Sequence, residues 1–364
     1  MKRFFIIILL AVCTGITVYA QIDLQPVAEV NLTRREPITV RQLKTEIEKL
    51  AWQTLTSRLG RIPTTAEINR EVQNSSIELR RQVLDVVINQ RLALQAAERD
   101  RVTVTENELN QHFTQLRAQM AQMAGRQPTE EEFALAIKNE TGQDLPAFRD
   151  TIRRQAIVEK YLMMKKQDLF TSITAPTEAE IVNFYNISKA DFVRPESVRF
   201  TMIQAAYGPD AASKARAKTL ADRLFLEIGS NPAKFDEVVV RGQSPNSGYQ
   251  AGDGGYILRN RLSLQAAGED FINTAFSLRQ GEVSKIIEGL RGYQIIKITE
   301  THSQRALELD DIAELGTRMT VRQFIGANLM QEKQQEVVSR AQNELIRELR
   351  TGNPFQIMES NLNF

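Results

Sequence analysis

The sequence predicts a mainly α-helical protein that carries an α+β satellite domain. Two observations support this fold class. Residues 21–188 contain repeated helix-start signals, followed by apolar residues at helical spacing. From about residue 190, alternating β-prone segments and short amphipathic helices follow one another, before a charged helical segment ends the sequence. We therefore expect a helical domain at 21–188, an α+β domain at 189–303 and a C-terminal helical segment at 304–364.

The first residues, 1–20, are typical of a secretory signal peptide. Two basic residues precede an unbroken apolar run at residues 4–12, which is too short to span a bilayer. We predict cleavage after Ala20 and export of the remaining chain. The alternative is lipidation of Cys13, which Val12 disfavours because a small residue is expected at that place.

Composition argues against several classes of function. Of the 46 basic residues two lie in the signal peptide, which leaves 44 against 45 acidic residues, so no electrostatic case for nucleic-acid binding arises. Cys13 is the only cysteine, and a chain cleaved after Ala20 forms no disulfide. No later segment is long and apolar enough for stable membrane insertion.

Helix starts in the first domain are marked by a Thr that a Glu follows three residues later. The Thr oxygen accepts from a backbone N–H of the first turn, and the Glu side chain reaches back to another. The pairs are Thr64–Glu67, Thr105–Glu108, Thr129–Glu132 and Thr177–Glu180. A proline precedes three of these pairs and blocks an earlier helix start. A strand-like opening, "PVAEVNLTRREPITV", lies before them.

Two helices carry apolar faces that need partners. The first has an apolar residue at every fourth position: Leu84, Ile88, Leu92 and Ala96. The second, near residues 106–123, presents four residues on one face: Phe113, Leu116, Met120 and Met123. We interpret the second face as core packing. The alternative is a surface for varied polypeptides, because Met repacks against different shapes at little cost.

The sequence contains no pattern that predicts a metal site or a catalytic nucleophile. His112 and His302 are the only histidines, and neither has a second His or Cys at ligand spacing, so no metal or cofactor is predicted. Neither lies beside a nucleophile-elbow motif. The glycine-rich stretch "AGDGGY" lacks the Lys-Ser/Thr of a phosphate-binding loop. We expect a loop there, with positive φ or a close approach of the backbone to another group.

The α+β region then resembles the parvulin-type prolyl isomerases. The matching segments are "GDGGY", "FSLRQGEVS" at 276–284 and "GYQIIKI" at 292–298, which are similar to the family's glycine loop, turn and closing strand. The helical region resembles the N-domain of SurA-like periplasmic chaperones, through "RRQVLDVVINQRLALQAAERDRVTVTENEL" and "DLPAFRDTIRRQAIVEKYL". The resemblance implies a helical N-domain completed by a C-terminal helix, a parvulin-like domain inserted between them, and a periplasmic location.

The same resemblance maps the isomerase site onto residues that differ from the family pattern. The two strand histidines correspond to Met202 and Gln294, and the Cys or Asp beside them corresponds to Pro245. We therefore name no confident catalytic residue. The expected groove residues are Tyr256, Phe271, Met202 and Gln294. Of the family's apolar proline pocket only Phe271 is kept, since Gly254 and Ala267 stand at its other positions.

Three hypotheses for function follow. The first is an exported chaperone that binds unfolded or outer-membrane polypeptides and uses its isomerase-like domain for binding or structure. The second is an active prolyl isomerase with a divergent site, and the third is an envelope-assembly scaffold with a single partner. The resemblance also implies that residues 304–364 pack on the N-domain. An apolar stripe in that segment needs such a partner: Leu315, Met319, Phe324 and Leu329.

Overall fold

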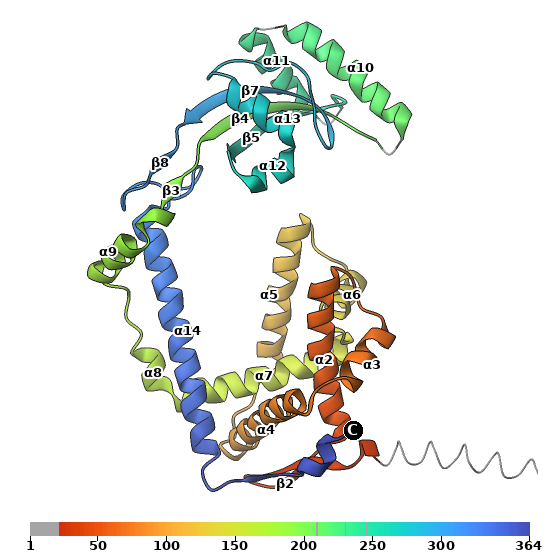
Figure 1. Cartoon of the computed structure of the whole chain (residues 1–364), viewed down its shortest axis with the longest axis vertical. Coiled ribbons are helices and arrows are strands. Elements are labelled where there is room, and N and C mark those ends of the chain that lie inside the picture. The colour runs from red at the N-terminus through yellow and green to blue at the C-terminus, as the bar shows by residue number, and fades with distance from the viewer. Residues whose placement is uncertain (1–21, 209, 230, 245) are drawn as a thin grey trace, which may run out of the picture. The chain divides into compact units, whose positions relative to one another are not determined.

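The computed structural model describes residues 22–364 except 209, 230 and 245. The predicted signal peptide and Cys13 therefore lie outside the described residues. The chain divides into two compact units, one ending at Ile173 and resumed at Lys333–Phe364, the other running from Thr174 to Glu332. Figure 1 labels the elements of both. The mainly helical fold with an α+β satellite is confirmed.

The first unit combines a small antiparallel sheet with a set of helices. The strand-like opening forms a hairpin of β1 (Pro26–Asn31) and β2 (Arg35–Thr39), and β9 (Phe355–Ile357) pairs on the other side of β1. The helices are α2 (Val40–Leu59), α3 (Thr65–Gln73), α4 (Ile77–Arg99), α5 (Glu106–Ala124), α6 (Glu130–Thr141), α7 (Leu145–Lys165), α8 (Gln167–Thr171) and the second part of α14 (Val321–Leu349).

The four predicted capping boxes are confirmed. In each, the Thr side chain accepts from the backbone of the Glu, whose side chain accepts from the Thr backbone. A fifth box, Thr39 with Gln42, begins α2 and was not predicted. These reciprocal bonds satisfy backbone donors that would otherwise lack partners at a helix start.

The core of the first unit is built around α4. Its predicted stripe is fully buried, because Leu84, Ile88, Leu92 and Ala96 all have 0% exposure. Residues near the end of the chain join the same buried cluster: Ala341, Leu345, Leu349 and Leu362. The buried Arg80 also donates to the carbonyl of Leu362 at 2.8 Å. The C-terminal segment therefore completes the helical domain.

The predicted C-terminal stripe requires a correction. Met319 and Phe324 are 46% and 41% exposed, and Leu329 packs in a cluster with Tyr185 of α9 (Glu178–Ile187). The residues of α14 that join the buried cluster of the first unit begin at Ala341. The compact units accordingly divide after residues 173 and 332, whereas the sequence placed domain limits after 188 and 303. The sequence does not reveal this division, because α14 is one continuous helix. Its earlier apolar residues pack in one buried cluster and its later ones in another.

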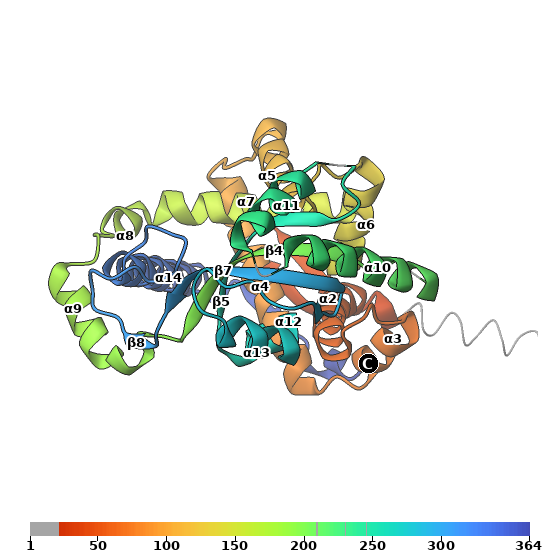
Figure 2. The ribbon, with the colours of Figure 1, turned by 90° about the horizontal axis from the view of Figure 1, so that it is seen from above.

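The second unit is built on a four-stranded antiparallel sheet in the order β5-β4-β7-β6. The strands are β4 (Ser197–Ala206), β5 (Gln250–Leu258), β6 (Ile287–Glu288) and β7 (Gly292–His302). Helices α10 (Ala211–Ile228) and α11 (Pro232–Gly242) cover one face, and α12 (Arg261–Ala267) and α13 (Glu269–Ser277) lie at the other (Figure 1). Seen from above, α10 runs along β7 (Figure 2). A short ladder of β3 (Val193–Arg194) and β8 (Arg305–Ala306) lies beside α9.

The glycine-rich stretch is a strand, which corrects the predicted loop. It forms β5, whose pairing with β4 shifts register between Phe200 and Thr201. Gly255 takes a φ of +74 beside this bulge. A Cβ at Gly254 would lie 2.2 Å from the Phe200 ring. The glycines are needed because the strand bends and approaches an aromatic ring, and not because the chain forms a ligand loop.

Candidate functional site

The structure brings two of the predicted site residues onto one face of the second unit's sheet. Met202 pairs with Ile296, and Gln204 pairs with Gln294, on the adjacent central strands β4 and β7. Side chains alternate along a strand, so Met202 and Gln294 lie on the face that α13 covers, diagonally across the ladder. Met202 packs against the buried cluster of this face. Pro245 lies outside the described residues.

Phe271 does not line an open slot. Its side chain is only 3% exposed and packs edge-on against Phe200, with ring centroids 5.2 Å apart. Phe200 occupies the space that a side chain at Gly254 would need, and Ala267 packs partly buried against the same cluster. Phe271 therefore lies in the packed core of this face, and its place in a peptide groove stays a prediction.

Gln294 makes one weak contact. Its amide Nε2 lies 3.4 Å from Oε1 of Gln204, and its own Oε1 is buried without a hydrogen-bond partner among the described residues. Two amides thus face each other at the place where the resemblance puts a polar cluster. Neither side chain ionises, so this pair cannot exchange protons as histidines do.

Tyr256 lies on the opposite face of the sheet from Phe271, so the structure does not bring these two predicted groove residues together. It pairs with Arg199, and its hydroxyl donates to Glu300 Oε2 at 2.6 Å. This bond lowers the pKa of the Glu300 carboxyl and raises the pKa of Tyr256. Arg199 binds Glu300 at 3.0 Å and Asp253 at 2.7 Å, and His302 lies 3.3 Å from Glu300. These charges are paired with one another and serve to hold β4, β5 and β7 together.

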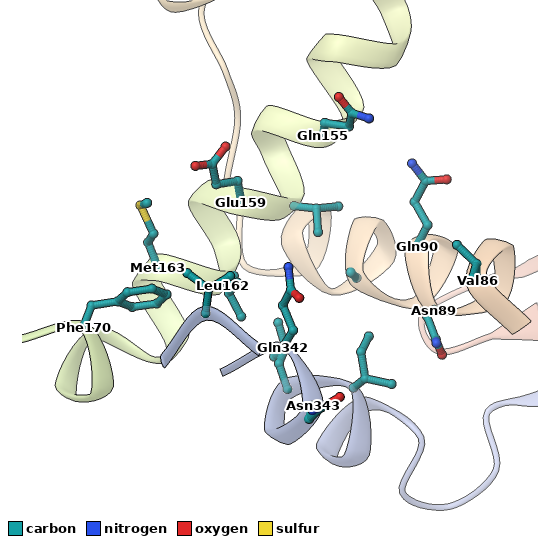
Figure 3. Close-up of a pocket in the computed structure, with 15 residues that line it drawn as sticks. Val86, Asn89, Gln90, Gln155, Glu159, Leu162, Met163, Phe170, Gln342 and Asn343 are labelled. Atoms are coloured by element: carbon teal, nitrogen blue, oxygen red, sulfur yellow. The ribbon is translucent and has the colours of Figure 1, made fainter. Parts of the chain in front are cut away.

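A groove of about 620 Å³ lies in the first unit, and the sequence did not predict it. It is lined by α4, α7, α8 and the second part of α14 (Figure 3). Three apolar side chains at the groove are open to solvent, since Val86 is 67%, Met163 50% and Val338 37% exposed. Beneath them lie buried residues of the core, including Leu162 and Leu345. A contiguous apolar surface of this kind is typical of binding sites.

Amide side chains form most of the polar part of the groove, and Glu159 is its one carboxylate. They come from all three long helices: Asn89, Gln90, Gln155, Gln342 and Asn343. An amide side chain carries N–H donors and a carbonyl acceptor, and it does not ionise, so a change of pH does not alter these groups. It can therefore hydrogen-bond the backbone of a bound polypeptide without selecting a particular side chain. Apolar surface with neutral polar groups is the composition typical of ligand sites.

The helix near residues 106–123, here α5, supports the core-packing interpretation for most of its apolar face. Phe113 is buried in a small cluster, and Leu116 and Met120 pack partly buried against it. Met123 is 82% exposed and takes no part in the cluster. His112, on the same helix, is exposed and lines a second groove of about 320 Å³ together with residues of α7.

Two further findings concern the described part of the chain. Within residues 22–364, apart from the three gaps, no helix has the length and apolar character to cross a membrane. In the same residues no group of three or more His, Cys, Asp or Glu side chains is arranged to hold a metal ion.

Two family models match this chain. Residues 1–165 match a SurA-like N-terminal domain, and residues 176–314 match a PPIC-type PPIase domain, the parvulin class. These matches agree with the helical first unit and the α+β second unit.

Similar whole proteins are known as well. The chain is 25% identical over 262 residues to the chaperone SurA of Nitrosococcus oceani, covering 70% of this chain and 57% of that one. It is 28% identical over 225 residues to the chaperone SurA of Saccharophagus degradans, covering 61% and 48%. It thus spans about half the length of these relatives. A solved structure of SurA-like chaperones from Campylobacter jejuni aligns at 12% identity over 92% of this chain and 100% of that chain, with a TM-score of 0.36.

Proposed function

Because the chain belongs to the SurA-like proteins that carry a parvulin-type domain, we propose that it is a chaperone for unfolded polypeptides and that the groove of α4, α7 and α14 is its binding site. The relatives named above are called chaperones. The observation that carries the proposal is the exposure of Val86, Met163 and Val338 around a groove whose polar groups are mostly amides.

The apolar and amide lining of the groove suits a protein that binds unfolded chains reversibly. Apolar burial is worth about 25 cal/mol per Å² before the cost of ordering the bound chain. Amides pair with any backbone, so sequence selectivity is low. A net affinity near ~1 µM, or about −8 kcal/mol, then allows both capture and release. Aromatic-rich extended segments are the best occupants, because they bury the most apolar surface for little lost side-chain freedom.

A matched pair of double variants tests the site. Met163→Ser with Val338→Ser removes two exposed apolar side chains from the groove. The control, Met123→Ser with Leu135→Ser, removes two that are 82% and 58% exposed and lie outside it, on α5 and α6. We expect about tenfold weaker binding of an unfolded outer-membrane β-barrel protein for the groove variant, or ~1.4 kcal/mol. An equal or larger loss in the control would instead indicate unspecific adhesion.

We further infer that the parvulin-type domain does not catalyse isomerisation. Met202 has no proton to donate, Gln294 does not ionise, and Phe271 is buried edge-on against Phe200. Uncatalysed isomerisation takes roughly tens to hundreds of seconds, so even modest catalysis is measurable. A prolyl-peptide assay should give the uncatalysed rate. Acceleration that Gln294→Ala removes would favour the second candidate, an isomerase with a divergent site.

The proposal also covers location and partners. A signal peptide at residues 1–20 would bring the chain to the periplasm, where unfolded outer-membrane proteins are its proposed clients. Binding to several unrelated unfolded proteins would distinguish this chaperone from a scaffold with a single partner. Measuring aggregation suppression and prolyl-peptide turnover on the same preparation separates the chaperone from the isomerase.

A further inference from the structure

The groove of the first unit contains one ionisable side chain. Of the 15 residues that line it, only Glu159 carries a charge (Figure 3). Its side chain is exposed, and no described residue forms an ion pair with it. The nearby cations have other partners. Lys160 donates to Glu108 at 2.6 Å, and Lys166 donates to Glu348 at 2.6 Å. The carboxylate of Glu159 is therefore available to a bound molecule.

Glu159 also belongs to the second groove. That groove, of about 320 Å³, lies between α5 and α7 and is lined by Val104, His112 and Ala156 among others. Glu159 and Met163 line both grooves. They are four residues apart, hence one above the other on the same side of α7. The two grooves therefore adjoin at Glu159 and Met163, which are called the ridge below.

The ridge combines two kinds of contact. Met163 is 50% exposed and offers a flexible apolar surface. Glu159 offers a negative charge one turn before it. A Lys or Arg side chain matches both, because its aliphatic stem packs on apolar surface while its charged end stays in water beside the carboxylate. Because the other polar residues that line the larger groove are amides, Glu159 is the one lining residue there that can select a charge.

We propose that a client polypeptide crosses α7 in an extended conformation and places a Lys or Arg side chain over Glu159, with apolar residues before and after it in the two grooves. This proposal rests on the proposed chaperone function and adds a position-specific preference to it. Clients are then extended apolar segments interrupted by a single basic residue, and acidic residues at that position are disfavoured.

A peptide scan tests the preference. An apolar nine-residue peptide carries Lys at each position in turn, and matched peptides carry Gln or Glu at the same positions. The full-length protein is compared with Glu159→Gln, Glu159→Lys and a control, Glu131→Gln, which lies exposed on α6 outside both grooves. We expect Lys at one or two central positions to bind about threefold more tightly than Gln, as for an exposed ion pair.

Comparing the peptides across the variants shows whether the Lys preference comes from the charge of Glu159. Glu159→Gln should abolish the Lys preference, Glu159→Lys should reverse it in favour of Glu, and Glu131→Gln should leave it unchanged. The preference should also shrink as salt rises. A Lys preference that survives in Glu159→Gln would overturn the inference while leaving the chaperone proposal intact. Loss of peptide binding in all variants and in the parent protein would overturn both.

Discussion

Two regions of the molecule are lined by apolar residues but differ in how exposed these residues are. One is the sheet face under α13 in the second unit, and the other is the groove of α4, α7 and α14 in the first unit. On the sheet face, Phe200 and Phe271 pack together and Gly254 leaves room for them, so the apolar surface is closed. In the groove, Val86 and Met163 stay open to solvent. The comparison shows that apolar residues can be closed into a core in one unit and stay exposed at a groove in the other.

The largest expected effect tests how closed the sheet face is. Phe271→Ala should lower the free energy of unfolding of the second unit by about 3–5 kcal/mol, because it leaves a cavity beneath Phe200. Met163→Ala, in the open groove, should change stability by no more than about 0.5 kcal/mol. Chemical denaturation of both variants, followed by circular dichroism, measures the difference. Similar values for the two would mean that the sheet face is not packed as described.

A smaller effect tests the glycines on the same strand. Gly254→Ala places a Cβ 2.2 Å from the Phe200 ring, whereas Gly252 has no atom within 4 Å of the same position. We expect Gly254→Ala to cost about 1–3 kcal/mol through overpacking. Gly252→Ala is the matched control on β5 and should be nearly neutral. If both substitutions are neutral, Phe200 moves aside easily and the face can open.

The smallest expected effect separates acid stability from binding. In the first unit the glutamates of three capping boxes, Glu67, Glu108 and Glu132, have pKa values lowered to about 2 by ion pairs and by bonds from the capping Thr residues. Their pKa is lower in the folded state, so the stabilisation is present above the unfolded value near 4.3 and is lost as pH falls towards about 2. Thermal melting between pH 5 and 2 should show this loss.

Glu108→Gln should flatten that pH dependence, and Glu131→Gln, outside the capping boxes, should not. The amides of the groove do not titrate in this range. Binding of a client that carries no basic residue should therefore hold from about pH 5 to pH 8, and its loss in acid should follow the melting curve of the protein. Binding that fails while the protein is still folded would mean that charge contributes more to the groove than its lining indicates.

Local patterns predicted much of the fold because local physics produced it. The capping boxes at Thr64, Thr105, Thr129 and Thr177 act within four residues, and so they are visible in the sequence. The stripe of Leu84, Ile88 and Leu92 on α4 shows its helical period in the same way. The alternating β-prone segments that form β4 and β7 were also evident, because alternation depends on neighbouring residues.

The candidate site could be predicted only in part. The resemblance placed Met202 and Gln294 on two strands, and the structure shows that these strands are adjacent and that the two residues lie on one face. It also placed Tyr256 in the groove. Register shifts in the pairing of β4 with β5 and β7 place Tyr256 with Arg199 and Glu300 on the other side of the sheet. One extra residue reverses the direction of the side chains, and a bulge leaves no strong signal in a single sequence.

The sequence by itself determined the helices, their caps, the alternating strands and the division into helical and α+β parts, since these follow from periods of a few residues. Only the tertiary structure decided where α14 passes from one core to the other and which apolar residues stayed exposed. The groove joins residues 86–93, 155–170 and 338–346, which are separated by long stretches of chain. Whether Met163 is buried or open depends on how closely those helices pack, and that depends on every residue of the core at once.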